Sequence, residues 1–129
     1  MNRVNEEIDV IYNRYGEPAL RLLENGRFVG FDGKSIGFLD GENLYNYKGR
    51  HVGFFENGIL RDRESACVGF GEKATDTPHP FLPFKQFKPF PSFVEFEPFR
   101  PFKQAPSFKP FKKFNWSEIE PRDLFFQNV

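Results

Sequence analysis

The sequence of 129 residues has little of several residue types on which many proteins depend, with one Cys, one Met, one Trp and two His. A single Cys excludes an intramolecular disulfide framework and a zinc site built from several cysteines. No stretch approaches the roughly 18 consecutive apolar residues that a membrane-spanning helix needs. The start of the chain also lacks the basic and then apolar pattern of a secretory signal, so we expect a cytoplasmic protein.

Net charge is absent too, since 18 basic side chains balance 18 acidic ones, but the balance hides three unlike segments. Residues 1–77, the head, carry 10 basic and 13 acidic side chains, whereas residues 78–115, the tail, carry 7 and 2. Residues 116–129, the C-terminal segment, carry 1 and 3. The 19 Phe divide as 6, 11 and 2 over the same segments. These boundaries predict a three-part chain in which opposite charges weakly favour packing of the tail on the head.

The head is a repeat with a step of 16 residues, and turn signals arrive about every eight residues. Between the turns lie short segments rich in Val, Ile, Tyr and Phe, which are typical of strands. The repeat therefore predicts an all-β fold of about eight short antiparallel strands in four hairpins. Asn-Gly and Asp-Gly favour hairpin turns of type I′. The repeated features are the triplets Ile36-Gly37-Phe38, Val52-Gly53-Phe54 and Val68-Gly69-Phe70, and the turn pairs Asn25-Gly26, Asp40-Gly41 and Asn57-Gly58.

A glycine stands at the centre of each triplet, at Gly37, Gly53 and Gly69. Because strand side chains alternate between faces, Ile36 and Phe38 would share one face and the glycine would lie on the other. A recurring glycine in a strand marks either close approach of another backbone or a ligand, or a bulge where the sheet bends. The sequence leaves these two interpretations open.

The tail has a period of three, and Phe occupies eleven of twelve consecutive positions at that spacing. Pro often precedes these Phe and Lys or Arg often follows them. A helix or a strand would scatter the Phe, whereas polyproline II, with three residues per turn, aligns them along one edge. We therefore expect a polyproline II rod whose Phe stripe is buried against its own head, other copies, a partner protein, a membrane or stacked bases. The stripe comprises Phe81, Phe84, Phe87, Phe90, Phe93, Phe96, Phe99, Phe102, Phe108, Phe111 and Phe114, with Ala105 at the remaining position.

The C-terminal segment has the pattern of a short capped helical turn followed by apolar residues. Ser117 and Glu120 fit a capping box, and Pro121 limits how far the helix extends. Trp116 joins the Phe stripe as a candidate assembly residue, and together with the last apolar residues it would form a small apolar clasp.

The segment Tyr45-Asn46-Tyr47-Lys48-Gly49-Arg50-His51-Val52-Gly53-Phe54-Phe55-Glu56-Asn57-Gly58, followed by apolar-Pro triplets and a terminal Trp-Ser pair, resembles the bacterial 4-fold beta flower domain proteins. The likeness covers most of the chain, although in those relatives the triplets look richer in Ile and Pro. The family name implies four-fold symmetry, supplied either by four units within one chain or by four chains. The resemblance implies no activity and no functional residues.

Residues that could carry chemistry are sparse. His51 and His79 are the only histidines, and Cys67 is the only thiol. His51 stands beside Arg50 at a strand start, His79 lies between two prolines, and Cys67 is expected to be a small buried side chain. We find no carboxylate pair, metal-ligand spacing or phosphate loop, so we expect no catalytic residue, cofactor or metal.

Two functional hypotheses remain. The first, which we prefer, is a non-enzymatic structural protein that forms a symmetric homo-oligomer, expected to be a tetramer, through its hairpin heads and buried Phe stripes. The second is a binding module whose tail docks on a partner protein, with a membrane surface or single-stranded nucleic acid as less favoured partners because the tail has only a modest positive charge.

Overall fold

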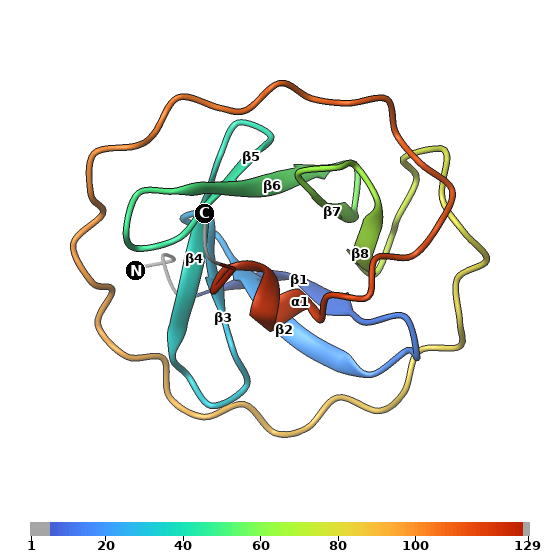
Figure 1. The fold of residues 1–129 in the computed structure, drawn as a ribbon. Helices are drawn as coiled ribbons and strands as arrows, with labels where there is room; N and C mark the ends of the chain where they lie inside the picture. The colour runs from blue at the N-terminus through green and yellow to red at the C-terminus, as the bar shows by residue number, and fades with distance from the viewer. Residues whose placement is uncertain (1–5, 128–129) are drawn as a thin grey trace.

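The short apolar segments of the head form eight strands that close into one barrel (Figure 1). The computed structural model describes residues 6–127. Each strand pairs antiparallel with the next along the chain, and β8 returns to pair with β1 through Tyr12 and Phe70. The all-β prediction is therefore confirmed. The strands are β1 (Glu7–Tyr12), β2 (Pro18–Leu23), β3 (Arg27–Val29), β4 (Ser35–Asp40), β5 (Asn43–Tyr45), β6 (His51–Glu56), β7 (Ile59–Asp62) and β8 (Cys67–Phe70).

The four-fold repeat lies within a single chain, because four successive hairpins complete the barrel. The connections alternate between two kinds. Within each hairpin a longer turn joins the strands; we call the four segments 13–17, 30–34, 46–50 and 63–66 the wide turns. Tight turns join one hairpin to the next. Of the three expected type I′ turns, only Asn57-Gly58 has positive φ at both residues, 46° and 83°. In the tight turn after β4 Gly41 alone has positive φ, which fits type II′ instead.

The barrel interior is filled by one apolar cluster to which every strand contributes. Strands this short cannot bury an apolar face in isolated hairpins, so closing the barrel is what creates a core. Two residues of the C-terminal segment, Leu124 and Phe125, complete the cluster at one end. The strand members are Ile11, Leu20, Leu22, Phe28, Ile36, Leu44, Val52, Leu60 and Val68.

The triplets are bulges, so the expectation that Ile36 and Phe38 share a face is wrong. In β4, Gly37 lies opposite Phe28 and Ser35 lies opposite Val29, which leaves Ile36 as an extra residue. The same shift occurs in β6 and β8. An extra residue bends a strand and changes which side chains point inward. Ile36 consequently belongs to the interior cluster, while the Phe38 ring lies outside it, 4.8 Å from the Arg100 guanidinium carbon of the tail.

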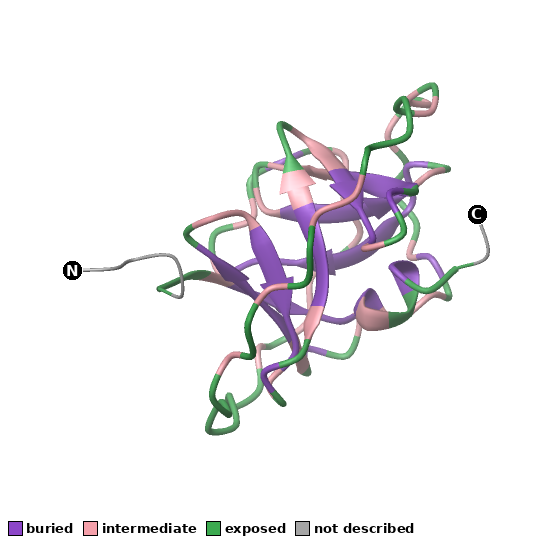
Figure 2. Ribbon diagram, turned by 90° about the vertical axis from the view of Figure 1, so that its left-hand side faces the viewer, coloured by how far each residue is buried: buried purple, intermediate pink, exposed green. Residues whose placement is uncertain are grey.

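The tail leaves β8 and runs around the outside of the barrel as a wavy ring (Figure 1). It contains no helix and no strand over 78–113. Its path therefore differs from a straight rod, because contacts with the wide turns bend it around the head. Polyproline II geometry stays a prediction. Figure 2 shows the buried strands surrounded by this mostly exposed or partly exposed ring.

The C-terminal segment crosses one end of the barrel and forms the helix α1 (Pro121–Leu124). The expected capping box does not form. Glu120 is the N-cap residue but makes no side-chain capping bond, and the Ser117 hydroxyl instead accepts from the Ile119 N–H at 3.2 Å. Pro121 is already the first helical residue, so Ser117 lies too far from the helix start to cap it.

Candidate interaction surface: a phenylalanine belt held by the wide turns

The tail docks on the head through main-chain hydrogen bonds that repeat every nine residues. The carbonyl oxygen at the same position of each wide turn accepts from a tail N–H. Nine tail residues are three triplets, so three tail triplets match one 16-residue unit of the head. The donor–acceptor pairs are Gln86 to Gly16 at 2.8 Å, Glu95 to Gly33 at 2.9 Å, Gln104 to Gly49 at 2.8 Å and Lys113 to Ser65 at 3.1 Å.

Glycine at three wide turns lets the tail backbone come this close. A Cβ on Gly16, Gly33 or Gly49 would collide with the carbonyl oxygen of Phe84, Phe93 or Phe102, respectively. All three glycines have φ between 81° and 84°, where other residues are strained. In the fourth turn Ser65 takes this place with φ 66°, and its hydroxyl donates to the Pro110 carbonyl oxygen at 2.9 Å.

Side chains of the head add a second bond to the tail main chain at the same nine-residue spacing. Arg27 Nη1 donates to the Glu95 carbonyl oxygen at 3.0 Å and Tyr45 Oη to that of Gln104 at 2.9 Å. Arg61 Nη1 donates to the carbonyl oxygen of Lys113 at 3.1 Å. The tail is thus bound mainly by its backbone, which leaves its Phe side chains free to point elsewhere.

Ion pairs join the tail to residues at the tight turns of the head and to the segment that follows β8, as the opposite charges of head and tail predict. Two hydrogen bonds, from Lys109 and Lys112, lower the pKa of Glu56 to about 2. The pKa of Lys112 is raised by its bonds to Asp76 and Glu56. The pairs are Lys88–Glu72 at 3.2 Å, Lys103–Asp40 at 2.7 Å, and at 2.8 Å Lys109–Glu42, Lys109–Glu56, Lys112–Glu56 and Lys112–Asp76.

His51 is a structural contact with the tail. Its ring is fully buried, Nδ1 lies 3.1 Å from the Ser107 N–H nitrogen, and Nε2 lies 3.1 Å from Asn43 Oδ1. Burial, aided by the charge of Arg63, lowers the pKa of His51, so the ring is neutral near pH 7. A neutral ring that accepts at Nδ1 and donates at Nε2 satisfies both bonds.

The eleven tail Phe form a row of exposed side chains, which we call the Phe belt. Their side chains are 72–101 % exposed, so the belt is not buried against its own head. Because the tail encircles the barrel, the belt faces outward around its circumference (Figure 1). Ala105 interrupts it at one position. The belt comprises Phe81, Phe84, Phe87, Phe90, Phe93, Phe96, Phe99, Phe102, Phe108, Phe111 and Phe114.

Trp116 does not belong to the belt. It is only partly exposed and packs beside Phe70, with ring centroids 6.3 Å apart, next to the cluster of Val10, Tyr12, Ile59, Cys67 and Phe70. The residues on both sides of Trp116 are hydrogen-bonded to β8. The Cys67 N–H donates to the Asn115 carbonyl oxygen, and the Ser117 N–H donates to the Cys67 carbonyl oxygen. Trp116 therefore fastens the end of the tail to the barrel.

The three triplet glycines lie away from the belt. A Cβ on Gly37 would collide with the ring of Phe125, one on Gly53 with the Arg61 carbonyl oxygen, and one on Gly69 would lie 2.8 Å from the Tyr12 carbonyl oxygen. Their neighbours belong to the barrel and its C-terminal segment. The glycines that the tail approaches are those of the wide turns, Gly16, Gly33 and Gly49.

The residues considered for chemistry are dispersed. Cys67 is buried, and burial raises its pKa, whereas His79 contacts only its neighbour's carbonyl, that of Pro80, at 2.7 Å. Over residues 6–127, no three His, Cys, Asp or Glu side chains gather as metal ligands. In the same range no helix is long and apolar enough to cross a membrane.

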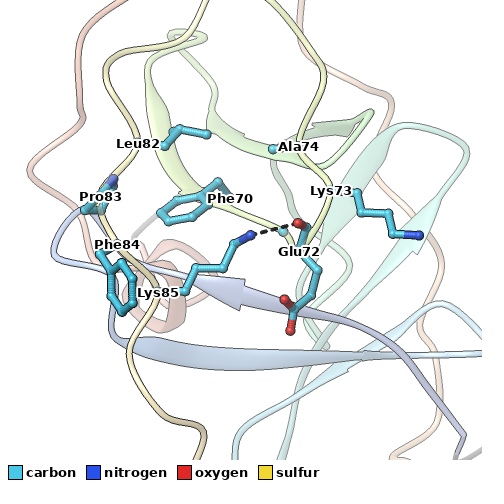
Figure 3. Close-up of a pocket in the computed structure, with 9 residues that line it drawn as sticks. Phe70, Glu72, Lys73, Ala74, Leu82, Pro83, Phe84 and Lys85 are labelled. Atoms are coloured by element: carbon cyan, nitrogen blue, oxygen red, sulfur yellow. Dashed lines mark hydrogen bonds between the residues drawn. The ribbon is translucent and has the colours of Figure 1, made fainter.

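A hollow of about 430 Å³ lies where the tail begins, between residues 82–85 and the chain that follows β8 (Figure 3). Lys85 reaches across it and donates to the Glu72 carbonyl oxygen at 2.8 Å. The Phe70 ring beside it is only 1 % exposed. This hollow is therefore a junction between tail and head, across which Lys85 and the Glu72 carbonyl already bind each other.

These features define a class of all-β protein in which one chain forms a four-hairpin barrel and wraps its own tail around it. The family model of the 4-fold beta flower proteins matches residues 9–125, so the chain belongs to that family. Comparison with curated proteins and with solved structures gives no match.

Proposed function

We propose that this protein is a non-enzymatic structural module that associates with further copies of itself through the Phe belt. The observation that carries the proposal is the exposure of all eleven belt side chains, at 72–101 %. Large apolar side chains that are gathered on one exposed surface mark interaction sites on soluble proteins. Burying one Phe side chain stabilises a complex by about 1.5–3 kcal/mol, so pairing even part of two belts is favourable.

The way the belt is held supports association with little loss of conformational freedom. Main-chain bonds at nine-residue intervals fix the tail before any partner arrives. A surface that is already ordered loses less entropy on binding than a free tail would. The tail encircles the barrel and its Phe side chains are exposed, so one copy can contact more than one neighbour, which is compatible with the expected tetramer.

The charged groups of the tail favour this partner over nucleic acid or an anionic membrane. Both of those partners need free cations. Lys88, Lys103, Lys109 and Lys112 are instead paired with carboxylates of the head, and Arg100 is paired with Glu97. A binding module for such anionic partners is therefore the weaker alternative. A non-enzymatic role is supported by the burial of His51 and Cys67, whose environments hold them neutral.

The test is mass in solution. At micromolar concentration we expect light scattering to give a multiple of the 15.2 kDa chain mass. Phe93→Asp with Phe96→Asp places two charges in the belt and should dissociate the assembly while the β-sheet circular dichroism is kept. Phe126→Asp changes an exposed Phe outside the belt, so it serves as the control and should leave the mass unchanged. A monomeric wild-type protein would refute the proposal.

A further inference from the structure

A second surface feature lies at the α1 end of the barrel, separate from the Phe belt. A pocket of about 390 Å³ opens where the third wide turn, Pro98 of the tail and the C-terminal residues Phe126 and Gln127 meet. This volume is within the range of about 300–1,000 Å³ that is usual for small-molecule sites. Its walls combine the apolar surfaces of Pro98 and Phe126 with the cationic side chains of Lys48 and Arg50.

The pocket exists because the C-terminal segment covers the four wide turns unequally. Glu120 accepts from Asn13 Nδ2 of the first turn at 2.9 Å, and Arg122 pairs with Asp32 of the second at 3.0 Å. At the third turn, the described part of the segment is held through its main chain, since Asn46 Nδ2 donates to the Phe125 carbonyl at 3.1 Å. The outward side chains of the third turn are left uncovered.

Those side chains carry an unbalanced positive charge. The other three wide turns each contain at least one carboxylate, whereas the third contains Lys48 and Arg50 and no acidic residue. Within residues 6–127 neither cation forms an ion pair or a side-chain hydrogen bond. Glu97, which precedes Pro98, is already bound by Tyr47 at 2.7 Å and by Arg100 at 2.6 Å. Among residues 6–127, no carboxylate in the pocket lining therefore neutralises the two cations.

The geometry points to a binding site for a small organic anion with an aromatic body. The aromatic body would lie against Phe126, which is 67 % exposed, and Pro98. The anionic group would face Lys48 and the guanidinium of Arg50, which can bind a carboxylate through two parallel hydrogen bonds. The side chains of Ser35, Asn46 and Tyr47 are hydrogen-bonded within the protein, so charge and apolar contact together determine the ligand class.

The experiment uses 2-naphthoate as the probe and backbone amide chemical shifts of the full-length protein as the readout. We expect a saturable titration that moves the amides of Lys48, Arg50 and Gln127. The matched compound 2-naphthamide has the same rings without the charge and should bind about fivefold more weakly or worse, since each exposed ion pair contributes about 0.2–1 kcal/mol. Acetate, which has the charge without the rings, should cause no saturable shift.

Variants separate this site from the belt. Lys48→Gln with Arg50→Gln should weaken naphthoate binding about fivefold, whereas Lys34→Gln, at the matching position of the second turn, should leave it unchanged. The double variant Phe93→Asp with Phe96→Asp should bind naphthoate with the wild-type affinity, whether or not it still assembles. Equal affinity for naphthoate and naphthamide, shifts confined to belt residues, or an unaffected Lys48/Arg50 variant would overturn the inference.

Discussion

The barrel and the tail both carry many apolar side chains but place them in opposite ways. In the barrel, side chains such as Phe28 and Leu60 are fully buried, and the backbone pairs with neighbouring strands. In the tail the Phe side chains are exposed and the backbone makes the contacts with the head. The barrel is therefore specified by the packing of side chains, whereas the tail is positioned by main-chain bonds and ion pairs. This difference makes the tail a scaffold that displays apolar groups at a fixed spacing.

The same substitution in the two regions should give the largest contrast. Phe28→Ala removes a fully buried ring and should lower the free energy of unfolding by about 3–5 kcal/mol. Phe96→Ala removes a ring that is 100 % exposed and should change it by about 0.5 kcal/mol or less. Urea unfolding at a concentration where both variants are monomeric measures the two values. A loss above about 2 kcal/mol for Phe96→Ala would show that belt side chains take part in packing within one chain.

The barrel was largely predictable because its signals are local. A turn signal about every eight residues and strand-forming residues between turns are sufficient to predict eight strands. Closure was not predictable, since it depends on the pairing of Tyr12 with Phe70 at the two ends of the head. The bulges at the triplets were one of two open interpretations, because a glycine alone does not say which neighbour approaches it.

The tail was predictable in period and charge but not in orientation. The spacing of three gives one Phe edge, and the opposite charges of head and tail predict contact between them. Which edge of the tail faces the head depends on the turn carbonyls at Gly16, Gly33 and Gly49, and the spacing of the Phe residues does not predict it. The sequence does contain a pattern that matches the docking. The residues whose N–H groups bind the wide turns are long polar residues at nine-residue intervals, namely Gln86, Glu95, Gln104 and Lys113.

A pair of glycine substitutions should separate docking of the tail from backbone strain. Gly41 and Gly33 both have positive φ, but a Cβ on Gly41 has no atom within 4 Å, whereas one on Gly33 collides with the Phe93 carbonyl. Gly41→Ala should therefore lower the free energy of unfolding by about 1–2 kcal/mol, through backbone strain alone. Gly33→Ala should lower the free energy of unfolding by about 0.5–1.5 kcal/mol more, because it also displaces the Glu95 N–H from the Gly33 carbonyl.

Limited proteolysis shows where the additional loss occurs. With Gly33→Ala we expect faster cleavage of the tail near Phe93, while Gly41→Ala should give the wild-type pattern. Equal cleavage in the two variants would mean that the tail does not depend on close approach to the wide turn.

The smallest expected effect concerns acid, and it tests whether the ion pairs help to hold the tail. Lys109 and Lys112 of the tail lower the pKa of Glu56 to about 2, below its ordinary value of 4.5. A carboxyl with a lowered folded pKa stabilises the docked state above its ordinary pKa, and this contribution is lost as pH falls from about 4.5 to 2. Because the pair is partly exposed to solvent, we expect the loss to be about 1 kcal/mol.

A carbon-13 titration of the Glu56 carboxyl should give the low pKa, and Lys109→Gln should raise that pKa. Glu56→Gln should reduce the fall in urea midpoint over this pH range, whereas Glu64→Gln, on an exposed turn of the head, should keep the wild-type pH dependence. A Glu56 pKa near 4.5 in the wild-type protein would show that the ion pairs of Glu56 do not help to hold the tail.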